Sequence, residues 1–132
     1  MSQIPNSKQN TYDLEERTLK FAKRVNGYVQ KLPRTISNIE NGKQLVRAAG
    51  STGANYIEAN ESLSKKDFQM RIKISKKEIK EARYWLKLTL PFKEQIQEKE
   101  ALIKEATELM KIFGSILEGS KKSKYLFGKL EN

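Results

Sequence analysis

The sequence predicts an all-α protein that folds as an antiparallel up-down four-helix bundle. Apolar residues recur at steps of three, four and seven in four successive stretches, and no stretch shows the alternation typical of a β-strand. The connections between the four stretches are short, and short connections place successive helices antiparallel and side by side. A chain of 132 residues is long enough for one continuous core.

The first helix is expected to open with a capping box at Asp13 and Glu16 and to end at Pro33. Its apolar face comprises Leu14, Phe21, Val25, Tyr28 and Leu32. Residues 1–11 are polar and aperiodic, so we expect a flexible N-terminal lead-in there, a bundle over 12–118 and a short basic tail over 119–132.

The second helix is expected to start near Thr35 or Ser37 and to run to about Ser62. We assign its core face to Ile39, Val46, Gly50, Gly53 and Ile57. Its middle, residues 48–54, is a run of small residues, and each glycine inside a helix costs about 1 kcal/mol relative to alanine. Close approach of another helix explains this run better than a phosphate-binding loop, because the Gly-Lys-Ser/Thr ending of such a loop is absent.

The third helix is expected to begin after the N-cap Ser64 and to run to about Leu90, and the fourth to extend from Lys93 to Glu118 with Gly119 as its C-cap. The predicted core face of the third helix follows a seven-residue repeat: Phe68, Ile72, Ser75, Ile79, Ala82, Leu86 and Thr89. That of the fourth helix is Leu102, Ala106, Leu109, Phe113 and Ile116 or Leu117.

Composition argues against catalysis and for a polyanionic partner. Without histidine or cysteine, the chain has no ordinary zinc site and no imidazole-activated nucleophile, so we expect no enzyme and no cofactor. A small hydrolase using Glu58 is the remaining catalytic alternative. We also expect a cytoplasmic protein, because no apolar run resembles a signal peptide or a membrane span. The net charge of +10 favours RNA, DNA or an acidic protein surface as partner.

The positive charge gathers on one strip of the third helix. Residues 65–91 hold nine basic and three acidic residues, whereas residues 92–118 hold four basic and six acidic ones. Eight of the nine fall between about 60° and 180° from Phe68 on a helical wheel. We call these eight the basic row: Lys65, Lys66, Lys73, Lys76, Lys77, Lys80, Arg83 and Lys87. The row is predicted to bind nucleic-acid phosphates together with Lys121, Lys122 and Lys124 of the tail, the alternative being a solvated face.

Two further strips suggest contacts with other helices or chains. An apolar strip of Met70, Ile74, Trp85 and Leu88 lies nearly opposite the core face and predicts self-association, unless Trp85 simply wraps to the edge of the bundle. Tyr84, next to Trp85, is an alternative candidate for stacking on bases. A polar stripe of Arg47, Ser51, Asn55 and Glu58 lines one side of the second helix and predicts a structural network with another helix or another subunit.

The segment Arg47-Ala48-Ala49-Gly50-Ser51-Thr52-Gly53-Ala54-Asn55-Tyr56-Ile57-Glu58-Ala59 resembles the signature of a bacterial family of four-helix-bundle proteins. Founding members of that family are encoded in intervening sequences within 23S rRNA genes. Phe68 and the segment Glu81-Ala82-Arg83-Tyr84-Trp85-Leu86 match its second motif, whereas Thr52 stands where the family often has Ile. The chain is also similar to the accessory variability proteins of diversity-generating retroelements.

This resemblance implies a homopentameric ring with no established enzymatic activity, and the polar stripe as a structural or subunit-contact motif. Together with the charge pattern, the resemblance predicts a non-enzymatic, oligomeric accessory protein that binds nucleic acid, foremost RNA. Such a protein would be a subunit of a reverse-transcriptase or rRNA-associated ribonucleoprotein. The alternative is a protein-interaction module whose basic ring docks a protein partner.

Overall fold

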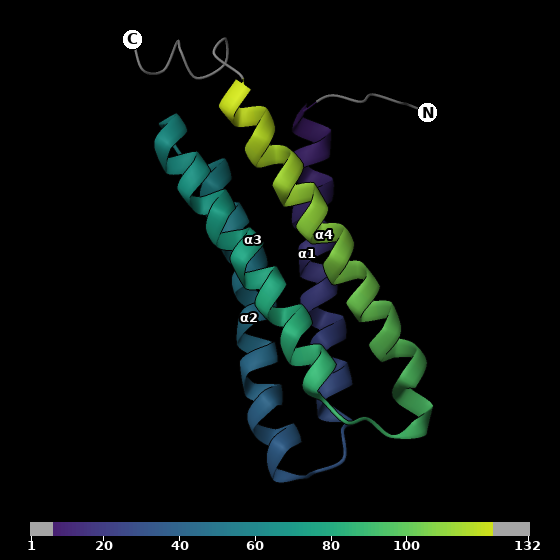
Figure 1. Ribbon diagram of the computed structural model, residues 1–132. Helices are drawn as coiled ribbons and strands as arrows, with labels where there is room; N and C mark the ends of the chain where they lie inside the picture. The colour runs from purple at the N-terminus through teal and green to yellow at the C-terminus, as the bar shows by residue number, and fades with distance from the viewer. Residues whose placement is uncertain (1–6, 123–132) are drawn as a thin grey trace, which may run out of the picture.

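The structure, a computed structural model, describes residues 7–122, with side chains described from Leu14 onward. Four helices follow one another along the chain: α1 (Ser7–Gln30), α2 (Ile36–Asn60), α3 (Lys65–Leu88) and α4 (Ile96–Lys122). A 3₁₀ turn, η1 (Lys93–Gln95), leads into α4. No strand occurs within residues 7–122, so the expected four-helix, all-α fold is confirmed (Figure 1).

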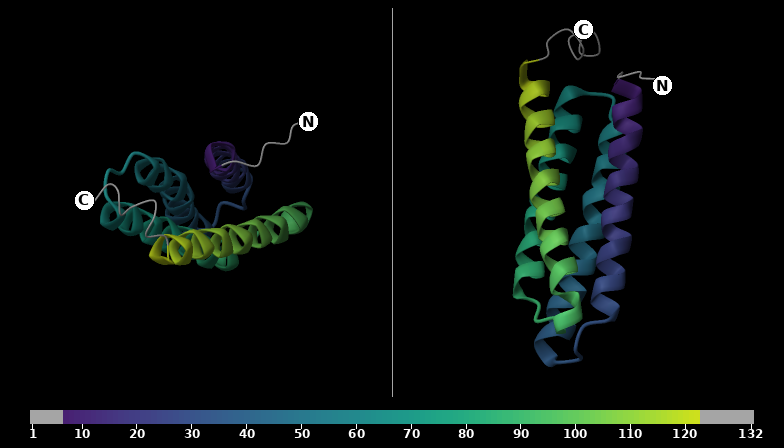
Figure 2. Two further views of the ribbon diagram at one scale, coloured as in Figure 1. Left: turned by 90° about the horizontal axis from the view of Figure 1, so that it is seen from above. Right: turned by 90° about the vertical axis from the view of Figure 1, so that its right-hand side faces the viewer.

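Successive helices run in opposite directions and pack side by side, and α4 returns to contact α1 (Figure 2). The α1–α2 and α3–α4 connections lie at one end of the bundle, and the α2–α3 connection lies at the other (Figure 1). Two arginines of α1 bridge to α4: the Arg17–Glu105 pair is 2.7 Å long and the Arg24–Glu98 pair 3.0 Å. The hydrogen bond from each arginine to its carboxylate raises the arginine's pKa, so both guanidiniums stay charged.

The N-caps predicted for α2 and α3 are confirmed, but the capping box predicted to open the first helix is wrong, and the end of the fourth helix also differs from expectation. Thr35 and Ser64 accept hydrogen bonds from the backbone N–H of residues 38 and 67, as good N-caps do. Helix α1 begins at Ser7, six residues before Asp13. Helix α4 continues through Gly119, which therefore is not a C-cap, because buried Ser120 bonds the Leu117 carbonyl and packs against α3.

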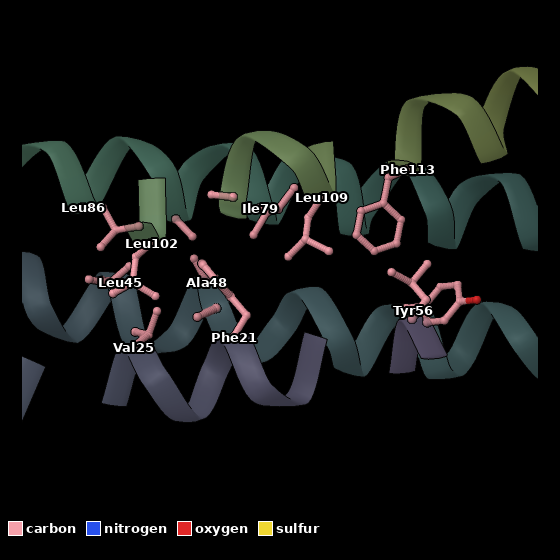
Figure 3. Packing of buried hydrophobic residues seen from close by; sticks show 14 of the residues in the cluster. Phe21, Val25, Leu45, Ala48, Tyr56, Ile79, Leu86, Leu102, Leu109 and Phe113 are labelled. Carbon is pink, nitrogen blue, oxygen red and sulfur yellow. The ribbon is translucent and has the colours of Figure 1, made fainter. Parts of the chain in front are cut away.

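The predicted core faces of α1, α3 and α4 are confirmed (Figure 3). All five predicted residues of α1 are buried, as are the predicted residues of α3 apart from Phe68, which is partly buried. In α4 the fifth position is filled by Leu117, while Ile116 lies at the edge. Figure 3 shows leucines, valine and aromatic rings meeting between the helices, with Phe113 of α4 near Tyr56 of α2 at a ring distance of 5.7 Å.

The predicted core face of α2 is wrong. Its apolar side chains Ile39, Val46 and Ile57 are 38–47% exposed, and the buried face is rotated by about 100° around the helix. The residues that α2 buries are mostly small: Asn38, Gly42, Leu45, Ala48, Ala49, Thr52, Tyr56 and Ala59. Small residues let α3 approach so closely that the Ser75 hydroxyl donates a hydrogen bond of 2.9 Å to the backbone carbonyl of Thr52. Close approach, rather than side-chain bulk, therefore decides which face is buried.

The two central glycines of α2 have different surroundings, which gives a stability prediction. A methyl group added at Gly53 would lie 2.8 Å from Thr18 Oγ1 of α1, whereas one added at Gly50 would meet nothing within 4 Å. We expect Gly50→Ala to raise the free energy of unfolding by about 0.5–1 kcal/mol, because alanine is the better helix former. Gly53→Ala should lower it by about 1 kcal/mol or more, because the methyl group overpacks the α1–α2 contact.

Urea denaturation of both glycine variants at one protein concentration checks this prediction. The two substitutions are chemically identical and lie three residues apart on one helix. Shifts of the same sign and size would mean that the α1–α2 contact at Thr18 has been misjudged.

Polar contacts fix the end of the bundle where two connections meet. The Asn38 side chain donates hydrogen bonds to the backbone carbonyls of Pro33 and Leu90 and accepts one from the Leu90 N–H, all 2.9 Å long. Nearby, Tyr28 of α1 and Thr89 share a buried hydrogen bond of 2.8 Å, and burial raises the pKa of the Tyr28 phenol. The two connections are therefore joined to each other and to α1.

Candidate nucleic-acid interface

The basic row follows α3 along the side that borders α4. Five of its side chains are exposed: Lys66, Lys73, Lys77, Lys80 and Lys87. Since an α-helix rises 1.5 Å per residue, these five span roughly 30 Å along the axis. Helix α3 holds them in one strip because its buried repeat, from Ile72 to Leu86, points the other way.

The remaining members of the row are partly buried, and two of them contact α4. Arg83 Nη1 donates a hydrogen bond of 3.1 Å to Thr107 Oγ1. The Lys76 ammonium lies close to Gly114, where an added methyl group would stand 3.7 Å from Nζ. Lys65 is also partly buried, at the start of α3. Arg83 and Lys76 thus lie along the α3–α4 seam and fix one border of the row.

No carboxylate neutralises the row within the described part of the chain. The acidic residues Glu78 and Glu81 of α3 pair instead with Arg47 of α2, at 3.3 and 3.4 Å, on the opposite side of the helix. In α4, Glu98 and Glu105 pair with the arginines of α1. These carboxylates therefore form ion pairs between helices, and the positive charge of the basic row remains uncompensated.

The predicted tail residues extend the row only in part. The Gln69 side chain of α3 donates a hydrogen bond of 3.1 Å to Ser120 Oγ, which brings the end of α4 to the start of the row. Lys121 and Lys122 are exposed there, and Lys121 pairs with Glu118 at 3.4 Å. Lys124 lies outside the described residues.

The polar stripe of α2 faces α3 within the same chain. Arg47 reaches Glu78 and Glu81, and Asn55 Oδ1 accepts a hydrogen bond of 2.9 Å from Arg71, a residue that sequence reasoning left unassigned. The Asn55 amide also donates to the Ser51 carbonyl. Glu58 is exposed at the end of the stripe. Two of the four stripe residues, Arg47 and Asn55, thus contact α3 within the same chain and form a seam between α2 and α3.

The apolar strip of α3 is only partly exposed in the structure. Ile74 and Trp85 are partly buried, and Trp85 packs against the core, with its indole Nε1 buried and without an acceptor among the described residues. Met70 and Leu88 are 48% and 41% exposed. Trp85 thus lies at the edge of the bundle, and the exposed part of the strip is smaller than the sequence suggested.

Sequence reasoning missed a group of large apolar side chains at the end where the two connections meet. We call it the loop-end patch: Ile36, Leu90, Phe92 and Ile96, each between 45% and 84% exposed. The hydrogen bonds of Asn38 hold Leu90 in place. A groove of about 490 Å³ lies beside it, between Leu90, Ile96 and Ile103. The nearby prolines 33 and 91 were the only sequence signal, and they mark turns rather than surfaces.

Within residues 14–122, no cluster of three acidic residues is arranged to hold a metal ion. Among the described helices, none is both long and apolar enough to cross a membrane.

Comparisons with known proteins identify relatives with the same fold. The family model described as "23S rRNA-intervening sequence protein" matches residues 10–115. A similar solved structure is a protein of unknown function from the S23 ribosomal protein family of Bacteroides thetaiotaomicron. It is 27% identical, aligns over 82% of this chain and 97% of its own, and superposes with a TM-score of 0.67. No curated protein matches the sequence.

Proposed function

We propose that this chain, which belongs to the 23S rRNA-intervening sequence protein family, is a non-enzymatic protein that binds RNA through the basic row of α3. The observation that carries the proposal is the absence of carboxylate partners for the row within the described residues, since α3's own Glu78 and Glu81 are held by Arg47. Unpaired ammonium groups on a fixed helix attract the closely spaced phosphates of a nucleic acid. The family's name makes RNA the first candidate among polyanions.

Binding of this kind depends strongly on salt, which gives a direct test. Each phosphate contact changes the logarithm of the binding constant by about −0.9 per decade of salt on duplexes and about −0.7 on single strands. With about five contacts, affinity should fall roughly 500-fold for duplex RNA and roughly 100-fold for single strands between 50 and 200 mM salt. Fluorescence anisotropy with a labelled rRNA hairpin measures this slope. Affinity that stays flat across the series would overturn the proposal.

We further propose that the functional unit is an oligomer, a homopentameric ring by resemblance, in the cytoplasm. Met70 and Leu88 of the α3 apolar strip are the proposed contacts, because each exposes over 40% of its surface as a monomer. Such a ring would present several basic rows to one RNA, as suits a subunit of an rRNA-associated or reverse-transcriptase ribonucleoprotein.

Light scattering tests the oligomer. The wild-type protein should have several times the chain mass of 15.2 kDa, and the double variant Met70→Glu/Leu88→Glu should approach that mass. The matched control is Val46→Glu/Ile57→Glu, which adds the same charges to exposed apolar positions of α2 and should keep the wild-type mass. A monomeric wild type, or a reversed result for the two variants, would contradict the proposed contact.

A second candidate function is a protein-interaction module, and the loop-end patch favours it. Four large apolar side chains are exposed at one end of the bundle, and such patches commonly mark protein contacts. Under this alternative, the wild-type protein captures a protein partner even after nuclease treatment. The substitution pair Leu90→Ser/Phe92→Ser then abolishes this capture. Under the leading proposal, the pair leaves RNA affinity unchanged.

A further inference from the structure

Tyr84 is an exposed aromatic residue on the border of the basic row. It is 58% exposed, while the other aromatic residues of α3, Phe68 and Trp85, are partly buried against the core. On the surface of a helix, residues three and four apart are neighbours. The neighbours of Tyr84 on the side of the row are therefore Lys80 and Lys87, both exposed.

The tyrosine ring is supported from one side. Its centroid lies 5.1 Å from that of Trp85, and the two rings meet edge to face at 74°. Because Trp85 packs against the core, it forms a fixed base for the tyrosine. Within the described part of the chain, the Tyr84 hydroxyl makes no hydrogen bond. An aromatic side chain is thus presented to solvent in a defined place without an evident role in folding.

We propose that Tyr84 stacks on an unpaired base of the RNA bound along the basic row, so that the protein prefers single-stranded or looped segments over continuous duplex. This inference rests on the proposed function. Lys80 and Lys87 lie about 10 Å apart along the axis, with Tyr84 between them, so they can hold phosphates on both sides of one stacked nucleotide. In a continuous duplex the bases are stacked on one another, and an A-form helix offers a side chain only its edges and backbone.

Stacking differs from phosphate binding in how it responds to substitution. The lysines act on any nucleic acid, whereas an aromatic ring contributes only where a base face is accessible. Replacing the aromatic residue of such a contact typically weakens single-strand binding by about fivefold to about a hundredfold. A purely structural role for Tyr84 would instead change the affinity for single strands and duplexes together.

The test compares Tyr84→Leu with Tyr84→Phe, which keeps the ring. Binding is measured to a non-self-complementary RNA strand and to the same strand annealed to its complement. Tyr84→Leu should weaken single-strand binding at least about fivefold and leave duplex binding within about twofold, while Tyr84→Phe should bind both like wild type. Equal losses on both RNAs, or no loss on either, would overturn the inference.

A spectroscopic readout separates stacking from proximity. The strand carries 2-aminopurine, whose fluorescence is quenched when it stacks on an aromatic ring. Saturating wild type and Tyr84→Phe should quench it, whereas saturating Tyr84→Leu should not, and quenching by Tyr84→Leu would contradict the inference. If reversing lysines of the row leaves every affinity unchanged, the proposed function itself fails; if it abolishes binding while Tyr84→Leu changes nothing, only the stacking role fails.

Discussion

Reversal of Lys73, Lys76, Lys80 and Lys87 to glutamate is expected to weaken RNA binding by about 100-fold or more at 100 mM salt. Each reversal removes an ammonium group from the row and places a carboxylate where a phosphate would bind, so attraction becomes repulsion. Loss of about four phosphate contacts should also make the remaining affinity much less sensitive to salt. Fluorescence anisotropy across a salt series measures both effects.

The chain offers a charge-matched control for this variant. Reversal of Lys20, Lys23, Lys31 and Lys43, all exposed on α1, α2 and the connection between them, changes the net charge of +10 by the same amount. Because these residues lie away from the row, we expect affinity to fall only a few-fold, through the weaker overall field of the protein. Equal losses in the two variants would show that net charge, rather than the row, governs binding.

Replacement of Arg47 by alanine is expected to lower the free energy of unfolding by about 2 kcal/mol. The Glu78 side chain is only 12% exposed, and its Oε1 atom is buried without a hydrogen bond, so Arg47 Nη2 at 3.3 Å is its main compensation. Without the guanidinium, a carboxylate remains in a poorly hydrated seam. The estimate lies below that for a fully buried pair because Arg47 is half exposed.

Two comparisons identify the cause of the Arg47 effect. Adding Glu78→Gln to Arg47→Ala should restore part of the lost stability, because a neutral amide costs less to bury than a carboxylate. Lys43→Ala removes an exposed pair with Glu40 on the same helix, 3.5 Å long, and should change stability by less than about 0.5 kcal/mol. Urea denaturation at equal protein concentration measures all three, and similar losses for Arg47→Ala and Lys43→Ala would contradict the role of the seam.

Three of the four buried faces could be predicted because their large apolar residues point in a single direction. In α1, α3 and α4, residues such as Phe21, Ile79 and Phe113 repeat along one strip, and burial of that strip dominates the free energy. Helix α2 carries bulky residues such as Ile39 and Ile57 on one side and alanines on another. Periodicity alone therefore favoured the bulky side, whereas the small side is buried because it admits α3 more closely.

The candidate site was likewise predictable from the sequence only in part. Segregation of charge on α3 follows from helical geometry and was predicted from the sequence, with the row and the acidic residues on different strips. Which carboxylates are neutralised could not be predicted, because Arg47 and Glu78 are 31 residues apart along the chain. Their pairing depends on the rotation and height of α2 against α3, which only packing fixes.

The sequence by itself determined the all-α class, the number of helices, the N-caps at Thr35 and Ser64 and the strip of α3 that carries the lysines. These features depend on local hydrogen bonds and on the 3.6-residue period, which act within a few turns of the chain. Only the tertiary structure decided which face of α2 is buried, where Trp85 lies and which charges remain uncompensated. Those outcomes depend on how closely two helices approach, and that distance is set jointly by side chains far apart in the sequence.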